Sequence, residues 1–176
     1  LVGGGIGSTF LCAKGVKVGK SICEKDLLRE ARELLDLASM SGKIILMPVD
    51  VVIAKEISAK ATAKVVDIDA IPEDAMILDI GPKTLKGYTM AISRAKTIIW
   101  NGPVGVYEYP QFASGTTGIA QAIAASQAIS VIGGGDSAAA INQLGLQDQI
   151  THISTGGGAT LEFLEGIELP GVKSCE

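Results

Sequence analysis

The chain has 176 residues, of which 47% are apolar and 19% are charged, and its formal net charge is −4. This composition excludes a disordered chain, and it lacks the basic footprint of a nucleic-acid-binding protein. No apolar run reaches the roughly 18 residues that a membrane-spanning helix needs, so we expect no nucleic-acid partner and no membrane partner.

The three cysteines are Cys12, Cys23 and Cys175, and no two of them lie close together in the sequence. An odd and dispersed set argues against a disulfide framework and against a zinc site. We therefore expect free thiols in a reducing compartment, and we predict a cytoplasmic location.

The chain opens on Leu1-Val2, followed directly by the glycines Gly3, Gly4 and Gly5. We interpret this opening as the end of a strand whose start is missing, followed by a helix-like stretch. We therefore expect the sequence to be part of a longer protein.

The next segments predict a helix and two strands. Residues 21–24 have capping-box spacing, and apolar residues then follow helical spacing over 27–38 up to Gly42, where the helix would end. Residues 43–47 predict a strand that Pro48 ends. Residues 75–80 predict another strand, which Gly81-Pro82 closes.

Along the rest of the chain, short apolar runs alternate with glycine-rich turns and helical stretches. The predicted strands are 97–100, 129–132 and 152–155, and the predicted helices are 84–94, 116–125 and 136–144, with Pro110 at a helix start. Apolar runs bounded by glycine are typical of the buried strands of a parallel sheet. The fold class is therefore α/β: a Rossmann-like parallel sheet flanked by helices, built from strand–glycine loop–helix units.

Three glycine triplets each follow an apparent strand, at 3–5, 133–135 and 156–158, and the Asn101–Gly105 loop follows a fourth. Parallel strands place all such turns at one edge of the sheet, where ligands bind. Glycine lets the backbone approach a ligand, and the following helix offers free N–H groups. One triplet alone would more often be a tight turn, but three together favour phosphate binding.

Single side chains near these loops have two interpretations each. Asp136 is either a helix N-cap or a carboxylate that holds Mg²⁺ on nucleotide phosphates, and its position does not decide between them. Ser137 adds a hydroxyl donor or a second cap. Glu108 is either a solvated carboxylate or a partner of a sugar hydroxyl. His152, the only histidine, has no relay partner and is interpreted as structural.

Two common nucleotide-binding motifs, the Walker A loop and the dinucleotide fingerprint, are each matched only in part. Residues 15–21 resemble a Walker A loop, but they have three residues between the glycines instead of four. Residues 3–8 lack the third glycine of the dinucleotide fingerprint, because Ser8 stands there. A NAD site is therefore weakly supported.

Taken together, the loops resemble phosphoglycerate kinase over essentially the whole chain and in order. The resemblance rests on the following segments: Gly3–Gly5 with Thr9–Leu11, Gly19–Ser21, Leu46–Asp50, Leu78–Thr84, Trp100–Glu108, Gly133–Ser137, Ser154–Ala159, Leu161–Gly166 and Leu169–Val172. In that family a parallel α/β domain at the C-terminal side binds Mg-ADP or Mg-ATP, and an N-terminal domain binds 3-phosphoglycerate. The resemblance implies that residues 1–176 are most of the nucleotide-binding domain.

The resemblance also implies roles for single residues. Gly134 and Gly157 would present their amides to the transferring phosphoryl group, as the catalytic backbone donors. Asp136 would hold Mg²⁺, and Ser137 would donate to a phosphate. Glu108 would bond the ribose hydroxyls. The remaining nucleotide contacts would be Gly3, Gly4, Gly5, Leu78, Asn101, Pro103, Gly135, Gly156 and Gly158.

The implied reaction is the reversible transfer of a phosphoryl group from 1,3-bisphosphoglycerate to Mg-ADP, which gives 3-phosphoglycerate and ATP in glycolysis. The family's catalytic arginine belongs to the N-terminal domain, and a phosphate-binding lysine precedes the first glycine triplet. Since neither is in this sequence, we expect the chain alone to bind nucleotide with little or no kinase activity.

Two alternatives stay open. A Rossmann-type dinucleotide or adenosyl binder would explain the strands and glycines, but not the three triplets or residues 100–108. A catalytically silent binding or assembly module is the other alternative, because an unpaired strand edge invites pairing with a second chain.

Overall fold

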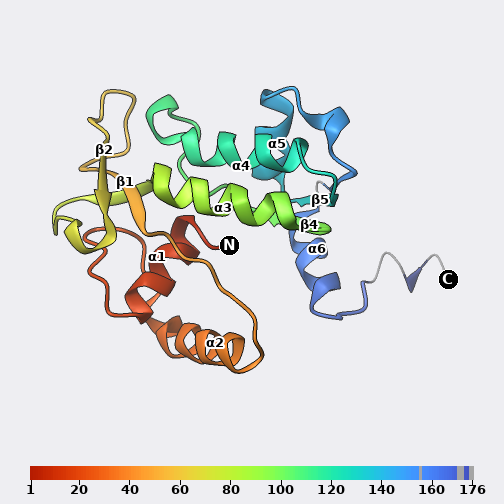
Figure 1. Ribbon diagram of the computed structural model, residues 1–176, viewed down its shortest axis with the longest axis horizontal. Helices are drawn as coiled ribbons and strands as arrows, with labels where there is room; N and C mark the ends of the chain where they lie inside the picture. Colours follow the sequence, from red (N-terminus) through yellow and green to blue (C-terminus); the bar gives the residue numbers. More distant parts are fainter. Residues whose placement is uncertain (155, 170–172, 175–176) are drawn as a thin grey trace. The chain divides into compact units, whose positions relative to one another are not determined.

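The computed structural model describes residues 1–154, 156–169 and 173–174 (Figure 1). The chain divides into two compact units. Unit 1 comprises residues 1–91 and 104–119, and unit 2 comprises residues 92–103 and 120–176. Thr155, Pro170–Val172 and Cys175, which the sequence interpretation used, lie outside the described residues.

Unit 2 contains the parallel sheet that the sequence predicts. Its strands are β4 (Thr97–Asn101), β5 (Ile129–Gly133) and β6 (His152–Ser154), in the order β4-β5-β6 and all parallel. Helix α5 (Gly135–Gln143) follows β5 and helix α6 (Gly157–Leu164) follows β6. Two strand–glycine loop–helix units are therefore confirmed. Gly145 follows the C-cap of α5, and its φ of 67° lies in the left-handed region that favours glycine.

Unit 1 contains a second sheet that the sequence did not reveal. It is antiparallel, in the order β2 (Lys64–Asp67), β1 (Asp50–Ala54) and β3 (Met76–Ile80). All five residues of β1 are buried, because its alternate side chains enter two different core clusters. Val51 and Ile53 pack with Ile71, whereas Val52 and Ala54 pack with Leu78 and Phe112.

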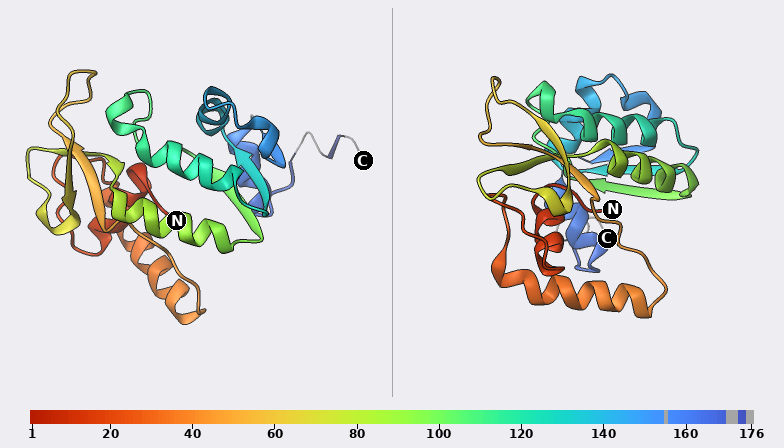
Figure 2. Two further views of the ribbon diagram at one scale, coloured as in Figure 1. Left: turned by 45° about the horizontal axis from the view of Figure 1, so that its top comes forward. Right: turned by 60° about the vertical axis from the view of Figure 1, so that its left-hand side comes forward.

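Two helices pack against each other in unit 1 (Figures 1 and 2). They are α1 (Gly4–Ala13) and α2 (Leu28–Met40), and a short 3₁₀ turn, η1 (Lys25–Leu27), precedes α2. Phe10 and Ala13 of α1 meet Ala31 of α2 in a common core cluster. The predicted helix and its end at Gly42, which has a φ of 64°, are confirmed.

The predicted capping box at Ser21 is wrong. The Ser21 hydroxyl donates to the carbonyl oxygen of Val18 and accepts a hydrogen bond from the Ile77 amide at 2.8 Å. The hydroxyl therefore joins this loop to β3 and does not start a helix. The helical turns begin only at Lys25.

The predicted strands at 1–2 and 43–47 are also wrong. The Val2 amide donates to the Leu46 carbonyl at 3.0 Å, but this single bond makes no ladder, and the structure assigns neither segment to a strand. The Tyr88 hydroxyl lies beside the Val2 and Leu46 carbonyls, at 2.6 and 3.0 Å. Tyr88 therefore ties the two extended segments to the helix that carries it.

That helix is α3 (Pro82–Arg94), and α4 (Ser114–Ala124) follows later in the chain. Both confirm predicted helices, and Pro82 takes the first helical position, which suits proline. Pro110 opens only a 3₁₀ turn, η3 (Pro110–Phe112). Two further 3₁₀ turns are η2 (Ile68–Ala70) and η4 (Gln147–Gln149).

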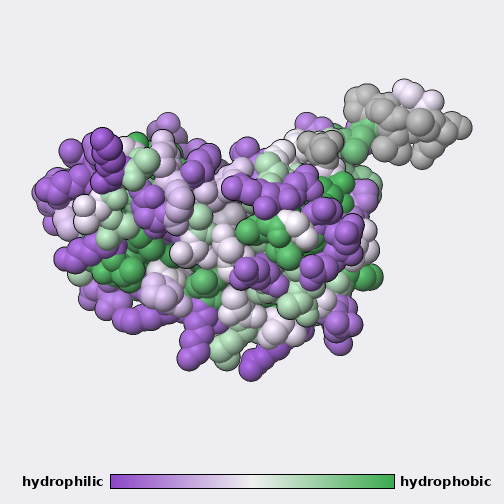
Figure 3. Space-filling view, turned by 90° about the horizontal axis from the view of Figure 1, so that it is seen from above, coloured by the Kyte–Doolittle hydropathy of each residue, from purple (hydrophilic) through white to green (hydrophobic). Residues whose placement is uncertain are grey.

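Polar side chains cover most of the face drawn in Figure 3, with apolar side chains between them. Among the described residues, none of the helices combines the length and the apolar character that crossing a bilayer requires.

Candidate functional site

The glycine loops of unit 2 begin side by side at the carboxyl edge of its sheet. The last residue of β4, Asn101, pairs with Gly133 at the end of β5, and Gly133 pairs with Ser154 at the end of β6. The three strands therefore end at one level. Every loop that leaves them starts from the same edge, as the sequence predicts for a ligand site.

The loops after β5 and β6 are in direct contact. A Cβ atom on Gly157 would lie 2.8 Å from the Cα of Gly134, closer than real Cβ contacts come. Gly134 itself has a φ of 92°, which side-chain-bearing residues rarely adopt. The Asn101 side chain lies against both loops, with its Nδ2 3.5 Å from the Gly157 carbonyl oxygen. Gly157 therefore has no room for a side chain, and Gly134 has a backbone conformation that favours glycine.

Both helices that follow these loops begin on glycine N-caps, Gly134 for α5 and Gly156 for α6. Within the described part of the chain, no side chain caps either N-terminus. The first helical bonds come from Ala138 to Gly134 and from Thr160 to Gly156. The earlier amides of both helices therefore have no helical partner, and their dipole ends favour an anion.

The two polar side chains of the first α5 turn have different surroundings. Asp136 is exposed and is not the N-cap, so its structural interpretation as a cap is wrong. Ser137 is fully buried, and its Oγ accepts a hydrogen bond from the Gly102 amide at 2.7 Å. The Ser137 hydroxyl thus positions the loop that follows β4. The donation from this hydroxyl to a phosphate, which the resemblance implies, stays a prediction.

Asp136 is the side chain of this loop that fits a metal ion. Mg²⁺ in nucleotide sites is commonly held by one or two carboxylates, with phosphate oxygens and water as the other ligands. Across residues 1–154, 156–169 and 173–174, there is no group of three or more side chains that could hold a metal. A single carboxylate, Asp136, therefore suits a Mg²⁺ ion whose other ligands are the phosphate oxygens of a nucleotide and water.

Of the other predicted site residues, Gly3, Gly4, Gly5, Leu78 and Glu108 lie in unit 1. Gly135, Gly158 and the half-buried Pro103 lie in unit 2. Gly3 is the N-cap of α1, and a Cβ there would lie 2.7 Å from the Cβ of Val104. The Gly4 amide donates to the Val104 carbonyl at 3.1 Å. Val104 therefore leaves no room for a side chain at Gly3, the first glycine of the triplet Gly3–Gly5.

Glu108 and Leu78 differ in exposure. Glu108 is exposed, whereas Leu78 is buried in the core of unit 1 with Val52 and Phe112. The Val106 amide donates to the Leu78 carbonyl at 2.8 Å, which holds the segment before Glu108 on β3. The carbonyl group of Leu78, and not its side chain, therefore holds the segment that leads to Glu108.

Two positioning residues were missed by the sequence interpretation. The buried carboxylate of Asp79 accepts from the Gly115 amide at 2.7 Å and from the Ile80 amide at 2.8 Å. Side chains at Gly105 or Gly115 would collide with it. The Thr116 hydroxyl accepts from the Val104 amide at 3.2 Å. Only tertiary contacts could reveal these roles, since both residues stand inside ordinary strand and helix patterns.

Burial raises the pKa of Asp79 to about 7, although the two backbone hydrogen bonds favour its charged form. The loss of solvation outweighs them because the side chain is completely buried. Asp79 therefore titrates near neutral pH inside the core of unit 1.

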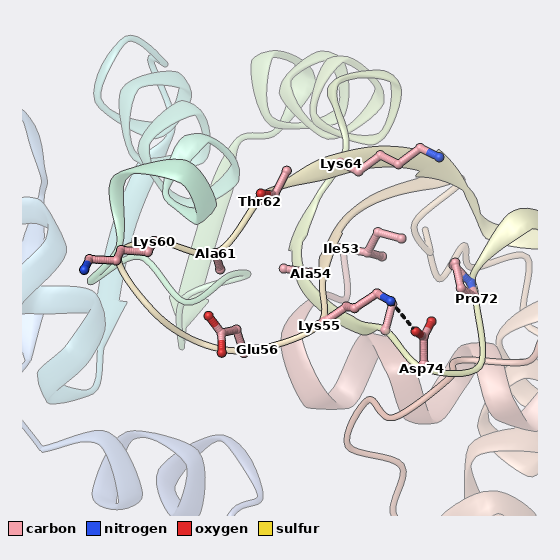
Figure 4. Close-up of a pocket in the computed structure, with 11 residues that line it drawn as sticks. Ile53, Ala54, Lys55, Glu56, Lys60, Ala61, Thr62, Lys64, Pro72 and Asp74 are labelled. Carbon is pink, nitrogen blue, oxygen red and sulfur yellow. Dashed lines mark ion pairs between the residues drawn. The ribbon is translucent and has the colours of Figure 1, made fainter.

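A pocket of about 810 Å³ lies elsewhere in unit 1 (Figure 4). Ile53 and Ala54 of β1 and Lys64 of β2 line it, and Lys55 and Asp74 form an ion pair of 2.6 Å beside them. None of the predicted site residues lines this pocket. The pocket is therefore separate from the glycine loops.

Comparisons with known proteins agree on one family. The sequence model described as phosphoglycerate kinase matches residues 1–167. The chain is 53% identical over 180 residues to phosphoglycerate kinase of Mycobacterium sp. (strain KMS) and 55% identical over 173 residues to that of Dictyoglomus turgidum. These alignments cover 100% and 98% of this chain, and the chain spans 44% of the length of each relative.

Solved structures give the same result. Phosphoglycerate kinase from Coxiella burnetii matches with a TM-score of 0.93 and 46% identity, over 98% of this chain and 44% of that one. The Pyrococcus horikoshii enzyme matches with a TM-score of 0.83 and 37% identity, over 97% of this chain and 43% of that one. The family model covers almost the whole sequence, and the chain belongs to the phosphoglycerate kinase family.

Proposed function

We propose that this chain forms the nucleotide-binding part of a phosphoglycerate kinase. The reaction is the reversible transfer of a phosphoryl group from 1,3-bisphosphoglycerate to Mg-ADP, with 3-phosphoglycerate and ATP as products. The substrates are ADP and ATP, and 3-phosphoglycerate binds through the N-terminal domain of the family. Glycolysis and free thiols favour a cytoplasmic location.

The observation that carries the proposal is the pair of helix N-termini at one sheet edge. The α5 and α6 amides without helical partners follow two glycine loops that touch each other through Gly134 and Gly157. Phosphoryl transfer requires mainly positioning and stabilisation of charge on equatorial oxygens. Backbone amides of these two loops supply such donors without any mobile side chain.

Asp136 would hold Mg²⁺ in this proposal, and the ion would neutralise the charge of the nucleotide phosphates. Ser137 and Asn101 would keep the β4 loop in place beside the amides, through the Gly102 and Gly157 backbone. The roles that the resemblance implies for Gly3–Gly5, Leu78 and Glu108 stay predictions.

The test is a calorimetric titration of the 176-residue chain with Mg-ADP and, separately, with ADP in EDTA. We expect Asp136→Ala to weaken Mg-ADP binding about tenfold or more and to leave metal-free ADP binding nearly unchanged, because only the metal-bound form uses the carboxylate. Asp148→Ala removes another exposed carboxylate of unit 2 and serves as the matched control.

The outcomes separate the alternatives. An equal loss with and without the metal would exclude Asp136 as a Mg²⁺ ligand. Tighter binding of NAD than of ADP would favour a dinucleotide binder. No binding of nucleotide by a demonstrably folded chain, together with concentration-dependent association, would favour an assembly module.

A further inference from the structure

Cys12 and Cys23 lie next to each other in unit 1, although they are far apart in the sequence. Cys12 lies in the last turn of α1, after which the chain turns back along the helix. The Glu24 amide donates to the Thr9 hydroxyl at 3.2 Å, so the segment around Cys23 lies on the Thr9 side of α1. Thr9 and Cys12 are three residues apart and share this face.

The two thiols are free, they line the same pocket, and Cys23 is close enough to Cys12 to raise the pKa of its thiol. The spacing of the cysteines in the sequence did not reveal this proximity. The reason is the reversal of the chain between α1 and α2, which no spacing rule for cysteines describes.

Both sulfur-bearing side chains line a pocket of about 440 Å³. Lys17, Lys25 and Glu73 lie in the same lining, where Lys17 and Glu73 form an ion pair of 3.6 Å, and both cysteines are half-buried. A small reagent can therefore reach the thiols beside Lys25, unlike a pair that is sealed inside a core.

We propose that Cys12 and Cys23 are a dithiol modification site that exchanges with low-molecular-weight disulfides, such as oxidised glutathione, and closes to an intramolecular disulfide. Disulfides of this kind in reducing compartments are typically transient and redox-sensing. The new bond would tie α1 to the segment that precedes α2.

Thiol–disulfide exchange proceeds in two balanced steps. The Cys23 thiolate attacks one sulfur of the external disulfide, forms a mixed disulfide and releases one thiolate of the reagent. The Cys12 thiolate then attacks the Cys23 sulfur and releases the second thiolate. The two released thiolates take up the two protons that the cysteines lose, so that the protein dithiol is oxidised to a disulfide and the reagent is reduced to two thiols.

The order of attack follows from the surroundings of Cys12. Burial and the contact with Cys23 raise the pKa of Cys12 to about 11, against a smaller opposing effect of Lys25. Cys12 is therefore mainly protonated at neutral pH and is the poorer first nucleophile. Cys23 stands in a segment without helix or strand, so closing the bond breaks no helix or strand around it.

The experiment incubates the folded 176-residue chain with oxidised glutathione at a range of glutathione ratios, followed by mass mapping of acid-quenched peptides. We expect a Cys12–Cys23 linked peptide, the loss of two free thiols and full reversal by dithiothreitol. Cys175→Ser leaves both members of the pair in place, and it should give the same linkage.

The single variants test the order of the steps. Cys12→Ser should accumulate glutathione on Cys23, whereas Cys23→Ser should remain largely unmodified. The proposal is overturned if Cys175→Ser retains glutathione on either cysteine without closing the bond, if Cys175 pairs with either residue in the wild type, or if the wild type stays unmodified. The wild-type mapping decides the linkage even where a serine variant folds poorly.

Discussion

Gly157 is the residue whose side chain would most directly separate the two glycine loops. An added Cβ would lie 2.8 Å from backbone at Gly134, and backbone cannot move aside as a flexible side chain can. We expect Gly157→Ala to weaken Mg-ADP binding about tenfold or more, since overpacking costs about 1–3 kcal/mol. Calorimetric titration with Mg-ADP measures this loss.

Gly87→Ala is the matched control. Gly87 lies within α3, and a Cβ there would meet nothing within 4 Å. Alanine should stabilise this helix by about 0.5–1 kcal/mol and leave the affinity for nucleotide unchanged. Equal affinities in the two variants would show that the contact between the loops does not matter for binding.

The raised pKa of Asp79 makes the free energy of unfolding depend on pH. Its folded pKa of about 7 lies above that of an unfolded aspartate. Between about pH 4 and pH 7 the folded chain binds a proton that the unfolded chain has lost. Its contribution to stability is therefore fully present below about pH 4, decreases as the pH rises through this window and is level above it.

Asp79→Asn removes this titration. The free energy of unfolding of the wild type minus that of the variant should therefore shrink by about 1–3 kcal/mol from pH 5 to pH 7.5. Urea unfolding at both pH values measures the difference. A difference that stays constant or grows with pH would contradict a raised pKa at Asp79.

At the scale of elements, two helices of unit 1 are capped by carboxylates from strands. Asp50 of β1 accepts from the Lys83 and Thr84 amides of α3, at 3.0 and 2.7 Å. Asp79 of β3 accepts from the Gly115 amide of α4. Each helix start is therefore attached to the antiparallel sheet by buried hydrogen bonds to an aspartate side chain.

Asp50→Ala should destabilise the chain by about 2–3 kcal/mol, because it leaves the two α3 amides and the Thr84 hydroxyl without their carboxylate partner. Urea unfolding gives this value. Asp67→Ala is the matched control, since it removes an exposed partner of Lys83 at the same helix, and it should cost less than about 1 kcal/mol. Similar losses in both variants would mean that the buried cap is unimportant.

The elements that the sequence predicted correctly are those whose signals are local. Strands β4, β5 and β6 are apolar runs closed by glycine, and these patterns also located the loops of the site. Strand β1 was missed because its apolar run, Val51–Ala54, is followed by Lys55 and lacks the closing glycine that marks β4, β5 and β6. The Ser21 cap failed because Ile77, distant in sequence, uses the same hydroxyl. The Asp79 and Ser137 contacts were invisible for the same reason.

At the scale of the whole molecule, nucleotide binding and folding are linked. A ligand that binds only the folded form stabilises it, by about 2.7 kcal/mol at a concentration one hundredfold above Kd. If Mg-ADP binds at the carboxyl edge of β4, β5 and β6, the gain should reach the amides of unit 2 that hold this edge. We expect amide exchange in residues 129–138 and 156–164 to slow by up to about 100-fold at this concentration.

The measurement is hydrogen exchange followed by mass spectrometry, with Mg²⁺ alone and Asp136→Ala with Mg-ADP as the controls. Slowing of exchange in the wild type that weakens in Asp136→Ala would connect the Asp136 carboxylate to the stability of the sheet edge. If calorimetry detects Mg-ADP binding while exchange in these segments stays unchanged, the nucleotide binds at some other surface. The two uncapped helix N-termini would then have no part in holding its phosphates, because backbone amides that donate to a bound anion exchange more slowly than amides that face water.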